Sequence, residues 1–364
     1  MSSRWTSEAL TDRLFPSARA APFGRALTRP RGARTPVIVV TGFLGAGKTT
    51  LVKHFIEAPE GAGTAIVVNE FGEIGIDDAL LRGSSDQTVL LGNGCLCCTS
   101  RSDLETTLRE LLADARIGRV PSIERVLIET SGLADPCPIL QTFVSDRGIG
   151  RELAVDLVIA VVDAVGGAEV LASAPEAHRQ VAVADRVIVT KRDLADDDAE
   201  MRLRAVIRAV NPNADIVVAR DGVVPASAWA PTGVPRSDFV ASEAAHSAGI
   251  ASFVLPFPEP VAWPAFAQAI DAIVALRGED VLRMKGLIAV PDVAGPLVIQ
   301  VVRHLVHPPV ELVDWPDADR RGRLVVIGRN LDPASVGAVF DALVGLCPAT
   351  AAGQAAVAGR RVAI

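Results

Sequence analysis

Residues 42–49 read GFLGAGKT, which matches the phosphate-binding pattern G-x-x-x-x-G-K-[ST]. A run of β-branched residues, 37–41, precedes the motif, and a helix-like stretch, 50–57, follows it. In this order the glycines let the backbone curl, so that its amides face a phosphate at the positive end of the helix. The motif therefore predicts a P-loop, with a nucleoside-phosphate site between a buried strand and a helix.

Within the P-loop, two side chains have predicted roles. Lys48 is expected to face solvent in the absence of ligand and to reach the β- and γ-phosphates when a nucleotide binds. The hydroxyl of Thr49 is expected to ligate Mg²⁺. The predicted nucleotide contacts in this segment are Gly42, Gly45, Ala46, Gly47, Lys48, Thr49 and Thr50.

Short hydrophobic runs alternate with helical stretches over residues 36–220. The runs are nearly continuous rather than alternating, which is typical of parallel strands buried on both faces. We therefore predict an α/β fold, with a doubly wound, mostly parallel sheet. The expected strands are 37–41, 65–69, 126–129, 157–162, 187–190 and 216–219, and the expected helices are 50–57, 103–113 and 199–210.

The rest of the chain divides by composition. Residues 1–35 are rich in Arg, Pro and Gly, which favours a disordered N-terminal extension over an organelle transit peptide. Residues 221–249 read as a linker, 250–350 as a smaller α+β domain, and 351–364 as a frayed tail. In the smaller domain we expect strands near 252–255, 286–290, 297–304 and 324–328, and helices near 263–276 and 333–346.

The overall composition excludes several classes of protein. A net charge of −7 argues against a general nucleic-acid binder, and 49% hydrophobic residues argue against disorder. No uncharged apolar run reaches about 18 residues, so no membrane span is predicted. Three of the five cysteines fall within residues 94–98, which indicates a reducing compartment, the cytoplasm, and a metal or redox role.

A second nucleotide signal follows the strand at 126–129. Glu129 at its tip is expected to hold Mg²⁺ through water, and Gly132 to let the backbone sense the γ-phosphate. The alternative is an acid that merely ends a strand.

A third signal, TKRD at 190–193, follows the strand at 187–190 and resembles the N-K-x-D motif of GTPases. Asp193 is expected to accept hydrogen bonds from guanine N1 and N2, with Lys191 along the base plane. Thr190 stands where Asn is usual, which weakens one contact. The motif favours guanine over adenine.

Cys95, Cys97 and Cys98 place three thiols in one short loop. Their thiolates suit Zn²⁺, and because a structural zinc site needs four protein ligands, an incomplete set indicates an open, exchangeable site. Buried apolar cysteines and a redox pair are the alternatives.

The acidic segment 69–78 follows a buried strand, where a GTPase keeps its first switch. Glu73 is a candidate for ordering the attacking water and for an extra oxygen ligand to zinc, and Asp77 is a candidate Mg²⁺ ligand. The alternative is a solvated acidic loop.

Together these motifs resemble the CobW-like family of P-loop GTPases, over about residues 36–335. The matching segments are 42–50, 69–77, 94–98, 129–136, 161–164, 190–193, 283–286 and 324–332. The resemblance implies a GTP hydrolase whose CxCC cysteines bind Zn²⁺, or cobalt or iron, and which delivers metal to a client metalloprotein. It also implies that the smaller CobW C-terminal-type domain helps to hold that client.

The sequence departs from the family at a few points. Many members carry a histidine-rich stretch, and its absence here argues against high-capacity metal storage. Some relatives have Glu where Val68 stands, which removes one candidate metal ligand.

The leading hypothesis is therefore a GTP-driven metallochaperone. A metal-sensing GTP-binding regulator with little turnover, and a P-loop kinase, are the alternatives. The expected partners are a guanine nucleotide and a client metalloprotein, with no nucleic acid and no membrane, and a homodimer is left open.

Overall fold

The computed structural model describes residues 34–69, 89–91, 101–146, 148–212, 214–230, 250–291, 293–307, 309–315 and 318–345. These residues form two compact units, one within Arg29–Gly233 and one within Val234–Ile364. None of the described helices is both long and apolar enough to span a bilayer.

The first unit is built on a seven-stranded sheet in the order β3-β2-β4-β1-β5-β6-β7, and each pair of neighbours is parallel. The central strand β1 (Thr35–Gly42) lies between β4 (Arg125–Thr130) and β5 (Leu153–Asp163). The other strands are β2 (Thr64–Asn69), β3 (Val89–Leu91), β6 (Arg186–Thr190) and β7 (Asp215–Val218). The short strand β3 was not predicted.

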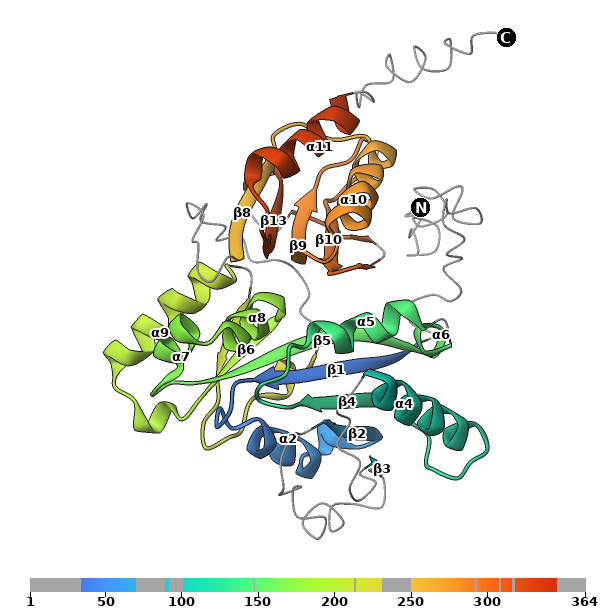
Figure 1. Ribbon diagram of the computed structural model, residues 1–364, viewed down its shortest axis with the longest axis vertical. Helices are drawn as coiled ribbons and strands as arrows, with labels where there is room; N and C mark the ends of the chain where they lie inside the picture. The colour runs from blue at the N-terminus through green and yellow to red at the C-terminus, as the bar shows by residue number, and fades with distance from the viewer. Residues whose placement is uncertain are drawn as a thin grey trace. The chain divides into compact units, whose positions relative to one another are not determined.

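Helices flank this sheet on both sides: α2 (Lys48–Glu57) on one, and α5 (Cys137–Ser145) and α8 (Pro175–Val183) on the other (Figure 1). Phe55 of α2 shares a buried core cluster with Ile38 of β1 and Trp229, and the ring centroids of Phe55 and Trp229 are 4.2 Å apart. The doubly wound α/β prediction is thus confirmed.

The remaining helices of this unit are α4 (Arg101–Arg116), α6 (Ile149–Glu152), α7 (Gly167–Ser173) and α9 (Asp197–Val210), with short 3₁₀ turns η3 (Pro59–Gly61), η4 (Arg192–Leu194) and η5 (Ala226–Trp229). Asp196 caps α9 by accepting a hydrogen bond from the Ala199 amide at 2.6 Å. Helices α4 and α9 were predicted, whereas α5 to α8 were not.

The second unit is an antiparallel sheet in the order β11-β10-β9-β13-β8, with β12 paired to β10. One face packs on α10 (Trp263–Arg277) and α11 (Pro333–Gly345), where the rings of Phe257, Phe266 and Phe340 meet at 5.2–5.5 Å. The strands are β8 (Ile250–Phe257), β9 (Val281–Ile288), β10 (Leu297–Val302), β11 (Leu305–Val306), β12 (Val310–Glu311) and β13 (Gly322–Arg329). The α+β prediction for this unit is confirmed.

The strand predicted at 286–290 was placed too late. Arg283 and Lys285 break the hydrophobic run, but in β9 they alternate with the core residue Met284 and are only 1% and 2% exposed. Because these two charged residues interrupt the hydrophobic pattern, the sequence did not predict the first half of β9.

The start of the predicted linker 221–249 is packed structure, because η5 lies within it and Trp229 is only 6% exposed. Residues 231–249, 1–33 and 346–364 lie outside the described residues. The linker that remains, the N-terminal extension and the frayed tail therefore stay predictions.

Candidate nucleotide-binding site

Four parallel strands deliver loops to one edge of the first sheet. The register pairs Val40 of β1 with Glu129 of β4, Gly42 with Val161 of β5, and Asp163 with Thr190 of β6. Because parallel neighbours end at the same edge, the loops after β1, β4, β5 and β6 gather there. This edge brings together the P-loop, the 131–136 loop and the 190–193 segment.

The P-loop leaves β1 through glycines that no other residue could replace without strain. Gly42, Gly45 and Gly47 have φ of 145°, 72° and 91°, a region that disfavours side chains. A Cβ on Gly42 would also lie 2.3 Å from the carbonyl oxygen of Val161. The loop then passes directly into α2, whose N-terminus no side chain caps within the described part of the chain, so its amides can bind an anion.

Lys48 does not face solvent as expected. Its side chain is 6% exposed, and Nζ donates a hydrogen bond to the carbonyl oxygen of Phe43 at 3.3 Å. The prediction was wrong because a curled loop presents its own carbonyl oxygens to the ammonium group. The lysine is already folded over the loop that would hold the phosphates.

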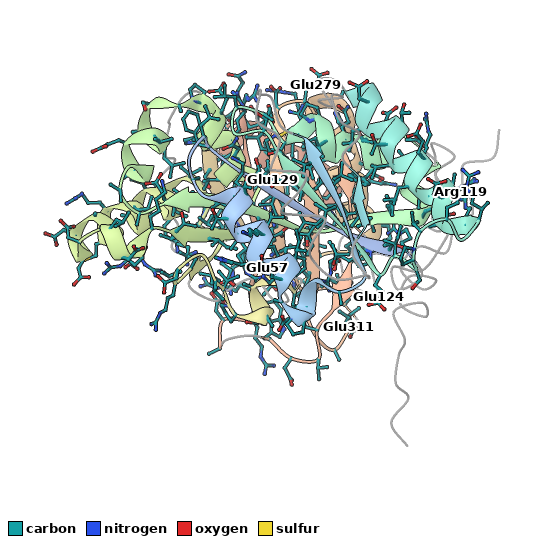
Figure 2. The ribbon with its side chains drawn as sticks, turned by 90° about the horizontal axis from the view of Figure 1, so that it is seen from below. Glu57, Arg119, Glu124, Glu129, Glu279 and Glu311 are labelled. Atoms are coloured by element: carbon teal, nitrogen blue, oxygen red, sulfur yellow. The ribbon has the colours of Figure 1, made fainter. Side chains whose placement is uncertain are left out.

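Thr49 and Glu129, which are 80 residues apart, meet at the end of β4. The Thr49 hydroxyl donates a hydrogen bond to Glu129 Oε1 at 2.7 Å, and Glu129 is 1% exposed, inside the fold (Figure 2). A hydroxyl and a carboxylate are hard oxygen ligands of the kind that Mg²⁺ prefers. The two oxygen ligands, from Thr49 and Glu129, therefore fit a magnesium ion bound beside the N-terminus of α2.

Gly132 lies against the P-loop. A Cβ at this position would be 2.8 Å from the backbone nitrogen of Leu44, closer than real Cβ contacts allow. Only glycine lets the 131–136 loop approach the P-loop so closely.

The residues of the 190–193 segment have different environments. Thr190 is 5% exposed, and its hydroxyl donates a hydrogen bond to the Ala46 carbonyl at 2.7 Å, so it contacts the P-loop backbone. Lys191 is exposed in a left-handed conformation with φ of 53°, and Asp193 is exposed in η4. Lys191 and Asp193 are accessible to a base, whereas Thr190 supports the backbone of the P-loop.

Comparison with known proteins identifies the group to which this site belongs. Residues 36–218 match the model of the CobW/HypB/UreG nucleotide-binding domain, and residues 250–344 match that of the cobalamin synthesis protein CobW C-terminal domain. The chain belongs to the CobW family.

Two curated CobW relatives align over most of their length. The zinc chaperone YjiA of Escherichia coli K12 is 31% identical over 318 residues, which is 84% of this chain and 98% of the relative. The zinc chaperone CobW of Pseudomonas aeruginosa is 34% identical over 363 residues, covering 88% and 94%. The crystal structure of the Zn(II)-bound YjiA GTPase from E. coli superposes with a TM-score of 0.63 at 28% identity, covering 85% of this chain and 99% of that one.

Several predicted site residues of this CobW-family chain fall outside the described residues: Glu73, Asp77, Cys95, Cys97 and Cys98. The predicted zinc site therefore stays a prediction. Within the described ranges, no group of three or more His, Cys, Asp or Glu side chains could hold a metal ion.

Two residues at this edge had no role predicted from the sequence, although one of them, Asp163, lies in the matching segment 161–164. Asp163, at the end of β5, accepts hydrogen bonds from the amides of Val165 and Gly166 at 3.1 and 2.7 Å and so orders the turn into α7. Gln180 of α8 reaches the 131–136 loop from a position 48 residues beyond Gly132. Gln180 lies in no motif, and its contact with a loop this distant in the chain has no local signal in the sequence.

The bond from Thr190 to the P-loop gives a testable expectation. Thr190→Val, which keeps the shape and removes the hydroxyl, should weaken GDP and GTP binding alike by about fivefold, since one buried hydrogen bond contributes about 1 kcal/mol. Thr190→Ser should retain most of the affinity. Titration with a fluorescent GDP measures this, and a valine variant with unchanged affinity would show that the bond does not hold the loop.

Proposed function

We propose that this CobW-family chain is a GTP-hydrolysing metallochaperone that binds Zn²⁺ at Cys95, Cys97 and Cys98 and delivers it to a client metalloprotein. The observation that carries the nucleotide part is the hydrogen bond between Thr49 and Glu129 beside the P-loop. The metal part is supported by the cysteine spacing and by the names of the relatives YjiA and CobW, both zinc chaperones.

The phosphates would be bound by the loop amides and by Lys48. To reach them, Nζ must exchange the carbonyl of Phe43 for phosphate oxygens. A charged acceptor makes the stronger hydrogen bond with an ammonium group, so the exchange favours the bound state. Gly45, Ala46, Gly47 and Thr50 would contribute backbone contacts.

Thr49 and Glu129 would hold Mg²⁺, with Asp77 as a further ligand in our proposal. The ion supplies neutralisation of the negative charge that develops on the transferred phosphoryl group. The backbone of Gly132 would contact the γ-phosphate, and Glu73 would order the attacking water. Glu73 and Asp77, both in the 69–78 segment, would thus respond to the presence of the third phosphate.

Asp193 and Lys191 would select guanine, which gives a second expectation. Asp193→Asn should lower GTP affinity by about tenfold or more, because hydrogen bonds to a charged group contribute about 1.5–3 kcal/mol. It should raise affinity for xanthosine triphosphate, whose carbonyl can accept a bond from the Asn amide. Asp198→Asn, also exposed and in the first turn of α9, is the matched control. Unchanged GTP affinity in the Asp193 variant would show that this segment does not recognise the guanine base.

Zinc would be the cargo. Three thiolates leave a tetrahedral ion one position short, which suits an ion that must be released, and Glu73 is our candidate for the additional oxygen ligand. The reduced thiols that such a site requires place the protein in the cytoplasm in this proposal.

The full chain tests the proposal directly. We expect GTP binding in preference to ATP, steady GTP hydrolysis, one zinc ion per chain at most, and zinc transfer to an apo-metalloprotein that accelerates with GTP. ATP preference with phosphorylation of a small molecule would indicate a kinase instead. GTP binding without turnover, with or without a client, would indicate a regulator. Cobalt and iron in the same titrations establish which metal the site prefers.

A further inference from the structure

Gln180 connects α8 to the loop that approaches the P-loop. Its side chain is 1% exposed, and Nε2 donates hydrogen bonds to the carbonyl oxygens of Gly132 at 3.2 Å and Ala134 at 3.0 Å. Gln180 belongs to neither the phosphate nor the base motif. Both hydrogen bonds are accepted by the 131–136 loop, which packs closely against Leu44 of the P-loop at Gly132.

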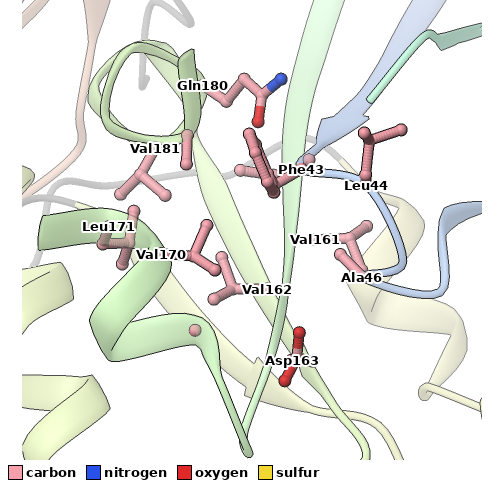
Figure 3. A pocket seen from close by; sticks show the side chains of 14 residues that line it. Phe43, Leu44, Ala46, Val161, Val162, Asp163, Val170, Leu171, Gln180 and Val181 are labelled. Atoms are coloured by element: carbon pink, nitrogen blue, oxygen red, sulfur yellow. The ribbon is translucent and has the colours of Figure 1, made fainter. Parts of the chain in front are cut away.

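The amide of Gln180 can take only one orientation. Its two partners are carbonyl oxygens, which only accept, so the NH₂ group must face them and Oε1 must face away. Figure 3 shows Oε1 turned toward Phe43, and within the described residues this oxygen has no hydrogen-bond partner. Gln180 lines a small apolar pocket that has room for about one water molecule and that Val181 also borders. A flipped amide would set oxygen against two oxygens, so the side chain is locked.

The backbone that carries Gln180 is itself fixed. Asn211 lies at the C-terminal end of α9, and its Nδ2 donates to the carbonyls that end α8, those of Val181 at 2.9 Å and Ala184 at 2.8 Å. The chain then enters β6, which finishes at Thr190 with its bond to the P-loop carbonyl of Ala46. A side chain can position another group only as accurately as its own backbone is held. One rigid helix–strand unit therefore contacts both the P-loop and the 131–136 loop.

A neighbouring ion pair acts on the same loop. Arg179 Nε lies 3.3 Å from Asp135 Oδ2, and the other oxygen of Asp135 accepts a hydrogen bond from the Cys137 amide at 2.9 Å. The Arg179 side chain is 19% exposed, so this pair is screened by solvent and contributes less than the buried amide. The loop is thus attached to α8 at Gly132, Ala134 and Asp135.

From this geometry we infer that Gln180 is a positioning residue for recognition of the γ-phosphate. Holding the carbonyl oxygen of Gly132 fixes the planar peptide that links it to Leu133, and with it the Cα of Gly132. The N–H of Gly132, the backbone donor that it could offer to a phosphate, lies on the other side of that same Cα. Gly132 is thereby kept in the place from which its backbone would contact the third phosphate. The inference rests on the proposed GTPase function and adds a residue to it.

The consequence is specific to the triphosphate. GDP binding would use the P-loop, Lys48 and the base segment, and among the described residues the side chain of Gln180 makes hydrogen bonds only to Gly132 and Ala134, outside all three. GTP binding adds the contact from Gly132, which Gln180 orients. Loss of Gln180 should therefore change the ratio of the two affinities, whereas loss of the Thr190 hydroxyl should lower both together.

The test is Gln180→Met, which fills the same space and donates no hydrogen bonds. We expect GDP affinity within about twofold of wild type, affinity for a non-hydrolysable GTP analogue lowered about fivefold to thirtyfold for the loss of two bonds, and kcat for GTP lowered by at least as much. Gln141→Met is the matched control, because Gln141 lies on α5 and its side-chain amide makes no hydrogen bond among the described residues. It should leave both affinities unchanged.

Gln180→Glu is measured beside it, because its carboxylate keeps the shape, remains polar and repels the two carbonyls. It should show the same selective loss of GTP-analogue affinity, so the inference remains testable if the methionine variant does not fold. Equal losses for GDP and the GTP analogue, or unchanged affinity for both, in a folded Gln180 variant would overturn the inference while wild-type hydrolysis still supported the GTPase. A wild-type chain that binds no GTP analogue would overturn both.

Discussion

Replacing Lys48 with alanine is expected to abolish measurable GTP hydrolysis while the protein remains folded. The ammonium group would supply the positive charge nearest the transferred phosphoryl group, and loss of one such stabilising donor lowers kcat by about 10²–10³. In the nucleotide-free chain the same group donates a hydrogen bond to the carbonyl oxygen of Phe43 in its own loop, and we expect the buried core residues Leu51, Val52 and Phe55 of α2 to keep the variant folded. Phosphate release measured under saturating GTP, together with the melting temperature, separates the two effects.

Lys53→Ala provides the control for this experiment. Lys53 lies on the same helix, α2, with 40% of its side chain exposed, and its ion pair among the described residues is with Glu57, at 4.0 Å. Such exposed pairs contribute little to stability. The Lys53 variant should hydrolyse GTP like wild type. A folded Lys48 variant with undiminished turnover would show that the P-loop does not bind the phosphates.

The second large effect is expected at the cysteine loop: Cys97→Ala should eliminate stoichiometric zinc binding but leave basal GTP binding near normal. If GTP and Mg²⁺ fix the 69–78 segment, and Glu73 with it, the two ligands are linked, and each changes the affinity of the other by the same factor. Typical coupling of 1–3 kcal/mol corresponds to about 5–150-fold. The Cys97 variant should lose this coupling along with the zinc. Zinc titrations with and without a non-hydrolysable GTP analogue measure both.

Cys137→Ala is the matched control, since Cys137 is 0% exposed at the start of α5 and cannot reach a metal in solvent. Zinc affinity of the wild type should also rise with pH, because the thiols must lose protons to bind the ion. Identical zinc affinities with and without the GTP analogue would mean that the metal site and the GTPase are energetically independent, which the proposed delivery cycle does not permit.

The parts of this molecule that were predictable from the sequence depend on local order. The P-loop needs a strand, a glycine turn and a helix in sequence, and residues 37–57 contain all three signals within one short segment. The parallel sheet was predictable for a similar reason, since strands buried on both faces are hydrophobic at nearly every position. The sequence pattern failed in β9, where Arg283 and Lys285 are buried in a strand despite their charge.

The contacts that organise the candidate site were not predictable in the same way. Thr190 bonds to a carbonyl 144 residues away, and Gln180 to carbonyls 46 and 48 residues away. Each depends on which strands are neighbours and on which face a helix lies, and a single sequence carries neither fact. The motif alone predicts a weakened base contact at Thr190, whereas the packing of β6 beside the P-loop shows that its hydroxyl donates to the Ala46 carbonyl.

The attachment of the P-loop at both ends affects how a nucleotide can enter. Gly42 packs closely against Val161 of β5, and the carbonyl of Ala46 accepts a hydrogen bond from Thr190 of β6. The loop is therefore held by two strands before any phosphate binds. The P-loop therefore loses its conformational entropy when the protein folds, and this cost does not oppose nucleotide binding. A loop built in this way should capture phosphate without a slow ordering step, and the exchange of the Lys48 ammonium group from Phe43 to the ligand becomes the main local rearrangement on entry.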